Sequence, residues 1–207
     1  MANTAMQLLA YVLCYAGLCG LIASTCMTNW KTIARPNGDT APQVEHVGLW
    51  MRCSTGAAGS TIICTPFSSI LHQSSETNVS RGLMIGSIII CGLALLVAIP
   101  GLKCTRCLDG GEQMKSKVAI VGGGLSIIGG LCSFGLICWY AYGVAQEFQN
   151  TSLIKYEFGE ALFVGGAAAL LSIIGGALLC ASSKPQKQFR SYPDKPSVSQ
   201  TQSTEYV

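Results

Sequence analysis

Charged side chains are scarce in this sequence. Only 11% of its 207 residues are Asp, Glu, Lys or Arg, which is less than half of the fraction that soluble domains carry. None of these residue types occurs in residues 1–30, 82–102, 118–146 or 161–183. Each window is long enough to cross ~30 Å of hydrocarbon as a helix of ~20 residues. The scarcity argues against a water-soluble protein and predicts four membrane-spanning helices.

The four windows also contain no His, whereas transporters and proton relays keep His, acidic or basic side chains at membrane depth. No nucleophile is clustered with a base, and Gly122-Gly123-Gly124 is not followed by the Lys-Ser/Thr of a phosphate-binding loop. His46 and His72 are single histidines of the first long loop, where solvation is the ordinary state. The sequence therefore disfavours transport through the bundle, and it indicates no enzyme, cofactor or metal site.

A basic n-region is missing before the first window, so this segment is expected to be a retained span and not a cleaved signal peptide. Most of the 13 basic residues lie in two segments, at Lys103, Arg106, Lys115, Lys117, Lys184, Lys187, Arg190 and Lys195. Segments rich in Lys and Arg favour the cytoplasmic side. The net charge of +3 is thus read as a signal of topology and not of nucleic-acid binding.

This charge pattern predicts a complete order of segments along the chain. Both termini are expected to be cytoplasmic, because four spans return the chain to the side where it began. The predicted segments are a cytoplasmic N-terminus at 1–7, spans at 8–27, 81–102, 118–142 and 161–182, outer loops at 28–80 and 143–160, a cytoplasmic loop at 103–117, and a disordered cytoplasmic tail at 183–207.

Small residues recur at four-residue spacing within the spans. The first span has Ala16, Gly20 and Ser24, and the fourth has Ala168, Ser172 and Gly176. Faces of this kind let helix backbones approach closely in lipid, where dispersion drives packing. The pattern predicts a compact four-helix bundle. Most of the 11 cysteines lie in or beside the spans, where Cys is an apolar packing residue.

Cys53 and Cys64 are the cysteines of the predicted outer loops, and an oxidising compartment favours their closure into a disulfide. If the two face each other across a hairpin, Ser54 pairs with Ile63 and Thr55 with Ile62. The tip is then Ala58-Gly59, where Gly suits the positive φ of a tight turn. The disulfide should contribute about 2–3 kcal/mol, mostly by restricting the unfolded chain.

Further short strands are expected in the first outer loop. Val, Ile, Thr and Trp predict strands at Trp30–Ile33, Val47–Cys53 and Ser60–Cys64, with a turn at 36–39 and a short helix within 66–72. Trp30 and Trp50 are expected at the membrane interface, where amphipathic rings are favoured. Such a ribbon is marginal alone, so it needs an anchor on the bundle.

The arrangement of these residues resembles the claudin family of tight-junction proteins. The matching positions are Trp30, Gly48-Leu49-Trp50, Cys53 and Cys64 in W-GLW-C-C order, Arg81 at the second span, Lys103-Cys104-Thr105, Trp139-Tyr140-Ala141, Lys155 to Gly159, and Tyr206-Val207. The first signature is shared with peripheral myelin proteins, epithelial membrane proteins and stargazin-like receptor subunits. The second loop and the C-terminus therefore distinguish the claudin family from these related families.

The resemblance implies a left-handed bundle of four transmembrane helices, topped by an extracellular antiparallel β-sheet of about five strands from both outer loops. It implies association with itself and other claudins, within one plasma membrane and between neighbouring cells. The product is a tight-junction strand that seals the paracellular space or forms charge-selective ion pores. The alternatives are a barrier-only member, an auxiliary subunit of another receptor or channel, and an adhesion protein like the peripheral myelin and epithelial membrane proteins.

Several outer-loop residues become candidate sites under this resemblance. The candidates for pore lining are Arg52, Lys31, Arg35, Asp39, Glu45 and Thr55, the last where some cation-selective members are acidic. The candidates for intercellular or lateral contact are Phe148, Tyr156 and Ile70. The second loop reads Glu147-Phe148-Gln149-Asn150-Thr151 and lacks the second aromatic residue and the Pro that the family often has.

The tail and the cytoplasmic loop carry separate candidates. Tyr206 and Val207 suit capture by a PDZ domain, in scaffolds of the zonula occludens type, because Val fills an apolar pocket. Cys104 and Cys107 lack a second ligand pair for zinc, so juxtamembrane S-acylation is preferred. Asn78 and Asn150 lie in glycan acceptor sequences close to a span.

Overall fold

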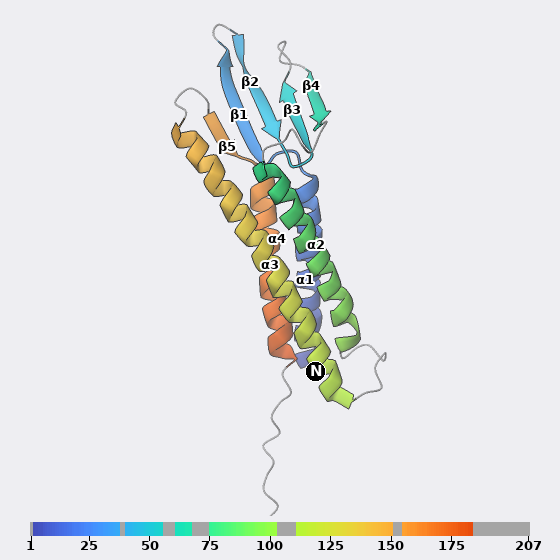
Figure 1. Cartoon of the computed structure of the whole chain (residues 1–207). Coiled ribbons are helices and arrows are strands. Elements are labelled where there is room, and N and C mark those ends of the chain that lie inside the picture. Colours follow the sequence, from blue (N-terminus) through green and yellow to red (C-terminus); the bar gives the residue numbers. More distant parts are fainter. Residues whose placement is uncertain are drawn as a thin grey trace, which may run out of the picture.

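Four long helices form a stem that carries a small β-sheet at one end (Figure 1). The structure is a computed structural model, and it describes residues 2–37, 40–55, 61–67, 75–102, 111–150 and 155–183. The helices are α1 (Ala2–Cys26), α2 (Ser75–Gly101), α3 (Gly111–Asn150) and α4 (Glu160–Ser182). All four are long and apolar enough to cross a membrane, as the charge-free windows predict.

Helix α3 is longer than the span predicted for it. Its 40 residues correspond to ~60 Å at ~1.5 Å per residue, about twice the thickness of the hydrocarbon. It includes residues 111–117 and 143–150, which the sequence assigns to connecting segments. Both stretches lack Pro and contain Gln and Glu, which support a helix outside lipid as well as within it. One end of α3 consequently rises beside the sheet (Figure 1).

Small residues line the contacts between helices. On α1, the residue in contact is Gly17 in place of the predicted Ala16. A Cβ on Gly17 would overlap the Ser172 hydroxyl of α4 and lie 2.9 Å from the Ser172 nitrogen. Gly20 and Ser24 also contact α4, as predicted. Ala16, however, is exposed, because Gly17 occupies the contact. Close backbone approach thus holds α1 against α4, as dispersion packing in lipid requires.

The sheet has five antiparallel strands in the order β4-β3-β2-β1-β5. Its strands are β1 (Lys31–Asn37), β2 (Thr40–Val47), β3 (Met51–Thr55), β4 (Ile62–Pro66) and β5 (Lys155–Phe158). Because β5 pairs with β1, both predicted outer loops contribute to one sheet. This confirms the expected sheet and its approximate number of strands.

The strand boundaries differ from the sequence prediction in one region. The predicted strand at Val47–Cys53 is in fact the end of β2, a turn at 48–50 and the start of β3. Strand β2 was not predicted, because Pro42, Gln43 and Glu45 interrupt any alternation of apolar residues. Pro66, expected to begin a short helix, lies in β4, and residues 68–74 lie outside the described residues.

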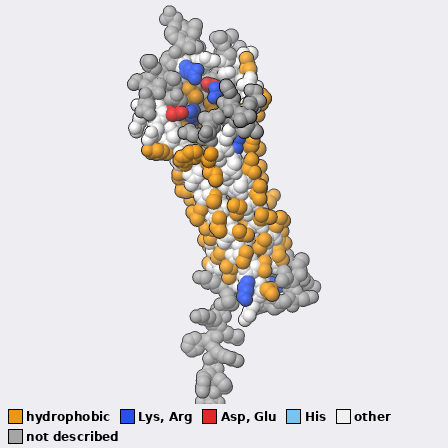
Figure 2. Space-filling model, in the orientation of Figure 1, with side chains coloured by type: hydrophobic (Ala, Val, Ile, Leu, Met, Phe, Trp, Pro, Cys, Tyr) orange, Lys and Arg blue, Asp and Glu red, His pale blue; other side chains and the backbone are white. Residues whose placement is uncertain are grey.

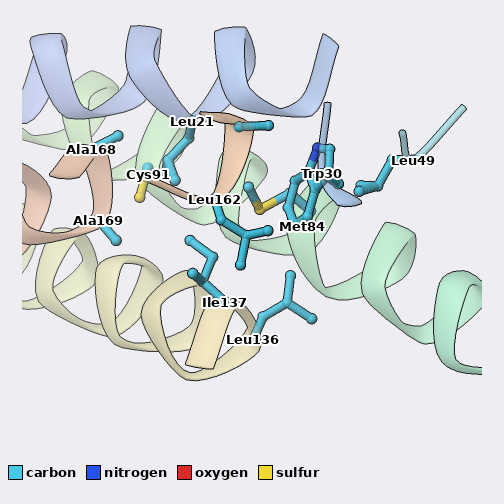
Figure 3. Packing of buried hydrophobic residues seen from close by; sticks show 11 residues of the cluster. Leu21, Trp30, Leu49, Met84, Cys91, Leu136, Ile137, Leu162, Ala168 and Ala169 are labelled. Atoms are coloured by element: carbon cyan, nitrogen blue, oxygen red, sulfur yellow. The ribbon is translucent and has the colours of Figure 1, made fainter. Parts of the chain in front are cut away.

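Trp30 is the central side chain between the sheet and the stem. Its relative exposure is 0%, so the predicted position at the lipid interface is wrong. The indole Nε1 donates to the Ser24 carbonyl at 2.9 Å, and the ring packs edge-on against Tyr140 at 5.3 Å. Figure 3 shows Trp30 beside Met84 and Leu49. A satisfied indole N–H allows complete burial, and the ring joins the first strand to the bundle core.

Two glycines allow the sheet to approach the ends of the helices. A Cβ on Gly48 would lie 2.8 Å from the Thr28 Cα, and one on Gly159 would overlap the Asn29 carbonyl oxygen. The Gly48 N–H donates to the Met51 carbonyl at 3.0 Å, which closes the turn between β2 and β3. The Gly of the Gly-Leu-Trp signature is therefore required by close approach of two backbone segments.

Arg81 connects α2 to that turn. It lies inside α2 and not at the start of the helix, and it is 9% exposed. Its Nε donates to the Leu49 carbonyl at 2.7 Å, and its guanidinium lies 5.3 Å from the centroids of both the Trp50 and the Phe67 ring. Asn78 accepts a longer bond from Nη1 at 3.5 Å. One buried cation thus ties the β2–β3 turn and the residue after β4 to the stem.

Substitution of Gly17 by Leu is expected to lower stability, because the added side chain meets the α4 backbone. Overpacking of this kind costs about 1–3 kcal/mol. The measurement is the midpoint of thermal unfolding in detergent. Gly86→Leu is the matched control, since a Cβ on Gly86 meets nothing within 4 Å. Equal melting of the two variants would contradict the packing described for α1 and α4.

Substitution of Arg81 by Lys is expected to lower the melting temperature although the charge is kept. Lys cannot stack a planar group between two rings while donating to Leu49, and loss of these contacts should cost about 1–3 kcal/mol. The comparison variant is Arg35→Lys, whose side chain is exposed. If both variants melt like the parent protein, Arg81 does not hold the sheet on the stem.

Candidate functional site on the sheet

A disulfide joins Cys53 of β3 to Cys64 of β4. Their Cα atoms lie 4.0 Å apart, and the two residues are direct partners across the strands. Ser54 pairs with Ile63 and Thr55 with Ile62, so the predicted register is confirmed for these positions. The predicted tip at Ala58-Gly59 lies outside the described residues. The disulfide closes the hairpin that forms the outer edge of the sheet.

The register separates the candidate charged residues from Thr55. Direct partners across antiparallel strands share a face, and successive residues alternate between faces. Lys31 pairs with Val47, which pairs with Arg52. Lys31, Arg35, Glu45 and Arg52 therefore lie on one face, which we call the charged face. Thr55 lies on the opposite face with Cys53, and Asp39 lies outside the described residues.

Two ion pairs organise the charged face. The Arg52 Nε lies 3.0 Å from Glu45 Oε1, and the Lys31 ammonium pairs with the Glu147 carboxylate of α3. The second pair joins the two predicted outer loops, because Glu147 lies on the part of α3 that rises beside β5 and Lys31 lies on β1, the next strand. Figure 2 shows blue and red side chains on the sheet and further blue side chains at the far end of the stem, whereas the stem between them is covered by orange hydrophobic groups.

The opposite face of the sheet carries hydroxyl groups and a histidine. Thr55 Oγ1 donates to the Val44 carbonyl at 2.7 Å, and Thr32 Oγ1 lies 3.3 Å from His46 Nδ1. Because its hydroxyl proton is committed to the backbone of β2, Thr55 contributes to holding β3 in place. The register also places the disulfide on this face, beside His46.

Exposed aromatic side chains flank the sheet on its α3 side. Phe148, the predicted contact residue, is 56% exposed at the end of α3. Phe158 of β5 is 49% exposed and was not predicted, although it belongs to the quoted Lys155 to Gly159 match. The remaining candidates lie outside the described residues or have side chains that are not described: Ile70, Tyr156, Cys104, Cys107, Tyr206 and Val207.

Phe67 and Glu147 are site residues whose roles the sequence did not suggest. Phe67 is close to two guanidinium groups, with Arg81 at 5.3 Å and Arg52 at 5.8 Å from its ring centroid. Phe67 is a single aromatic residue after a Pro, so no periodic pattern of side chains indicates its contacts. Nothing in the sequence around Glu147 indicates a partner more than a hundred positions away. Both contacts depend on the folded sheet.

Comparison with known proteins agrees with this architecture. Residues 4–179 match the model of the PMP-22/EMP/MP20/Claudin family. The chain is 38% identical to Claudin-19 of Mus musculus, over 93% of this chain and 88% of the relative. It is 40% identical to Claudin-1 of Rattus norvegicus, over 93% and 92%, and 38% identical to Claudin-7 of Rattus norvegicus, over the full length of both.

These similarities cover the stem, the sheet and both segments that build the charged face. Membership of this family implies a structural junction protein that associates with other claudins, and not an enzyme. Four apolar helices and a disulfide-closed sheet are what such a multi-pass membrane protein requires. The chain belongs to the PMP-22/EMP/MP20/Claudin family, as a claudin-like protein of the tight junction.

Proposed function

We propose that the chain polymerises within one plasma membrane and between neighbouring cells, and that its sheets line the paracellular conduits of the resulting strands. The observation that carries this proposal is the charged face, fixed on a membrane stem by Trp30 and Arg81 and closed at its edge by a disulfide. Fixed charges in a narrow conduit repel like-charged ions and concentrate ions of the opposite sign.

The proposed orientation has the sheet outside the cell and both termini in the cytoplasm. The Lys and Arg residues of 103–117 and 183–207 support it. The Cys53–Cys64 disulfide supports it independently, because disulfides persist in oxidising compartments and are rare in the cytosol. On this arrangement the exposed apolar side chains of the helices face membrane lipid.

The cytoplasmic segments are proposed to serve attachment. Tyr206 and Val207 would bind PDZ domains of scaffolds of the zonula occludens type, by adding as a strand to the domain. Cys104 and Cys107 would carry acyl chains beside the second span, where such groups reach the bilayer. Both proposals are supported by sequence position, since these four residues lie outside the described part of the chain.

Expression in cells that lack tight-junction strands tests the proposed function. Freeze-fracture images should show continuous strands at contacts between cells, and transepithelial dilution potentials should show whether the strands conduct. Strands without conductance would identify a barrier-forming member. Intracellular retention, or surface expression without strands while an unrelated receptor subunit co-purifies, would contradict the proposal and favour the auxiliary-subunit alternative.

Substitution of Cys64 by Ser is expected to abolish strand formation while the helices still insert in the membrane. The hairpin loses its cross-link, worth about 2–3 kcal/mol for so short a loop, and β4 has a partner on one side only. The measurement is freeze-fracture together with surface biotinylation. Cys138→Ser, at an exposed helix position without a disulfide, is the control and should form normal strands. Normal strands from Cys64→Ser would refute the role of the closed hairpin.

Substitution of Phe148 by Ser is expected to weaken contacts between claudins without unfolding the protein. Its side chain is 56% exposed at the end of α3, so burial in a neighbour is the way it gains free energy, at about 1.5–3 kcal/mol for a large apolar group. The measurement is enrichment of the protein at contacts between expressing cells. Gln149→Ser, the adjacent exposed position, is the control, and equal enrichment of both variants would exclude Phe148 from the contact.

A further inference from the structure

The ion selectivity of this conduit depends on which charges of the charged face are neutralised by a partner. Among the residues that the structure describes, five charged ones lie on this face or against it: Lys31, Arg35, Glu45, Arg52 and Glu147. A cation with a carboxylate in contact adds little to the field that a passing ion meets, since the two opposite charges cancel at a distance. The pairing pattern therefore matters more than the number of basic residues.

Arg52, one of the pore-lining candidates named from the sequence, is neutralised. Its Nε lies 3.0 Å from Glu45 Oε1, and its guanidinium lies 5.8 Å from the Phe67 ring centroid. The Glu45 side chain is only 13% exposed, so Arg52 covers it. These contacts fix Arg52 as part of the sheet and cancel its charge.

Lys31 is neutralised in the same way at the base of the sheet. Its ammonium pairs with Glu147, and its side chain is 16% exposed. The pair contributes cohesion between β1 and α3, and it presents no net charge to the solvent. Two of the three cations on this face thus have a carboxylate partner.

Arg35 is the remaining cation of the charged face, and within the described ranges no carboxylate is paired with it. Its partner across β1 and β2 is the uncharged Gln43. Strand β5 begins at Lys155, opposite Ala34, so no residue of β5 lies beside Arg35. Its side chain is exposed. It stands four residues beyond Lys31 on β1, which is ~13 Å at ~3.3 Å per residue and more than the Debye length of about 8 Å in physiological salt.

We propose that Arg35 gives the conduit a preference for small anions such as chloride over sodium. Its uncompensated guanidinium makes the charged face net positive far from the membrane, where the sheet meets the paracellular fluid. The proposal rests on the proposed function, because it requires that the charged face line the conduit. The sequence alone names Arg35 beside five other candidates, and the pairing in the folded sheet separates it from Arg52 and Lys31.

Dilution potentials across monolayers that express the full chain test this proposal. The parent protein is expected to pass chloride in preference to sodium. Arg35→Gln should lower the chloride-to-sodium permeability ratio about three-fold. One unit charge ~6 Å from an ion in water, screened over a Debye length of about 8 Å, changes the local concentration of each ion about 1.7-fold, in opposite directions for chloride and sodium. Arg35→Glu should lower it about ten-fold, since the charge changes by two units. If a carboxylate outside the described residues compensates Arg35, the parent protein should show no preference for chloride over sodium, and that result would overturn the proposal.

Variants of the ion pair between Arg52 and Glu45 are matched controls, one expected to raise the ratio and one expected to leave it unchanged. Glu45→Gln alone frees Arg52 and should raise the ratio about three-fold. The double variant Glu45→Gln with Arg52→Gln removes one charge of each sign and should leave the ratio unchanged. A ratio that responds to the double variant but not to Arg35→Gln would overturn the assignment.

Freeze-fracture of the same monolayers distinguishes failure of the Arg35 inference from failure of the proposed function. If strands form and conduct but the ratio does not follow Arg35, the inference about Arg35 fails and the proposed function stands. If no strands form with the parent chain, the proposed function itself fails. If conducting strands prefer sodium, and Arg35→Glu does not strengthen that preference, the charged face does not line the conduit.

Discussion

The contact of Arg81 with the Leu49 carbonyl, at 2.7 Å, is the one on which the position of the sheet depends. A cation that is 9% exposed must be compensated, and here the compensation comes from a backbone carbonyl, an amide oxygen and two aromatic faces. Removing the sheet would take away the Leu49 carbonyl and both aromatic rings, and of these partners it would leave the charge only the amide oxygen of Asn78 on its own helix. The stem therefore favours the sheet in one orientation, and Trp30 reinforces it from the neighbouring strand.

Because its orientation is fixed, each face of the sheet stays in one environment. A ribbon free to tilt would present its side chains to many surroundings, and an alternation of charged and uncharged residues would then have no consequence. Held on the stem and closed at one edge by Cys53 and Cys64, the sheet keeps Lys31, Arg35, Glu45 and Arg52 on one side. The Lys31–Glu147 pair adds a second support, because it ties β1 to the part of α3 that rises above the membrane.

The sequence predicts the elements of this fold better than the contacts between them. Four charge-free windows predict the helices because hydrocarbon excludes charge, and the two loop cysteines predict their own register because direct partners have a constant index sum. Burial of Trp30 and pairing of Arg52 were not predictable in this way. Both depend on partners, Tyr140 and Glu45, that only the folded chain brings near. Strand β2 was missed since its pattern of side chains is polar on one face and interrupted by Pro.

Amide hydrogen exchange of the full protein in lipid nanodiscs tests most directly whether the sheet and the stem form one rigid unit. The account predicts that amides of β1, β2 and β3 exchange as slowly as those at the adjoining ends of α1 and α2, because Trp30, Leu49 and Arg81 connect them. Fast exchange throughout these strands, with the helices still protected, would show that the sheet moves independently and would contradict the account.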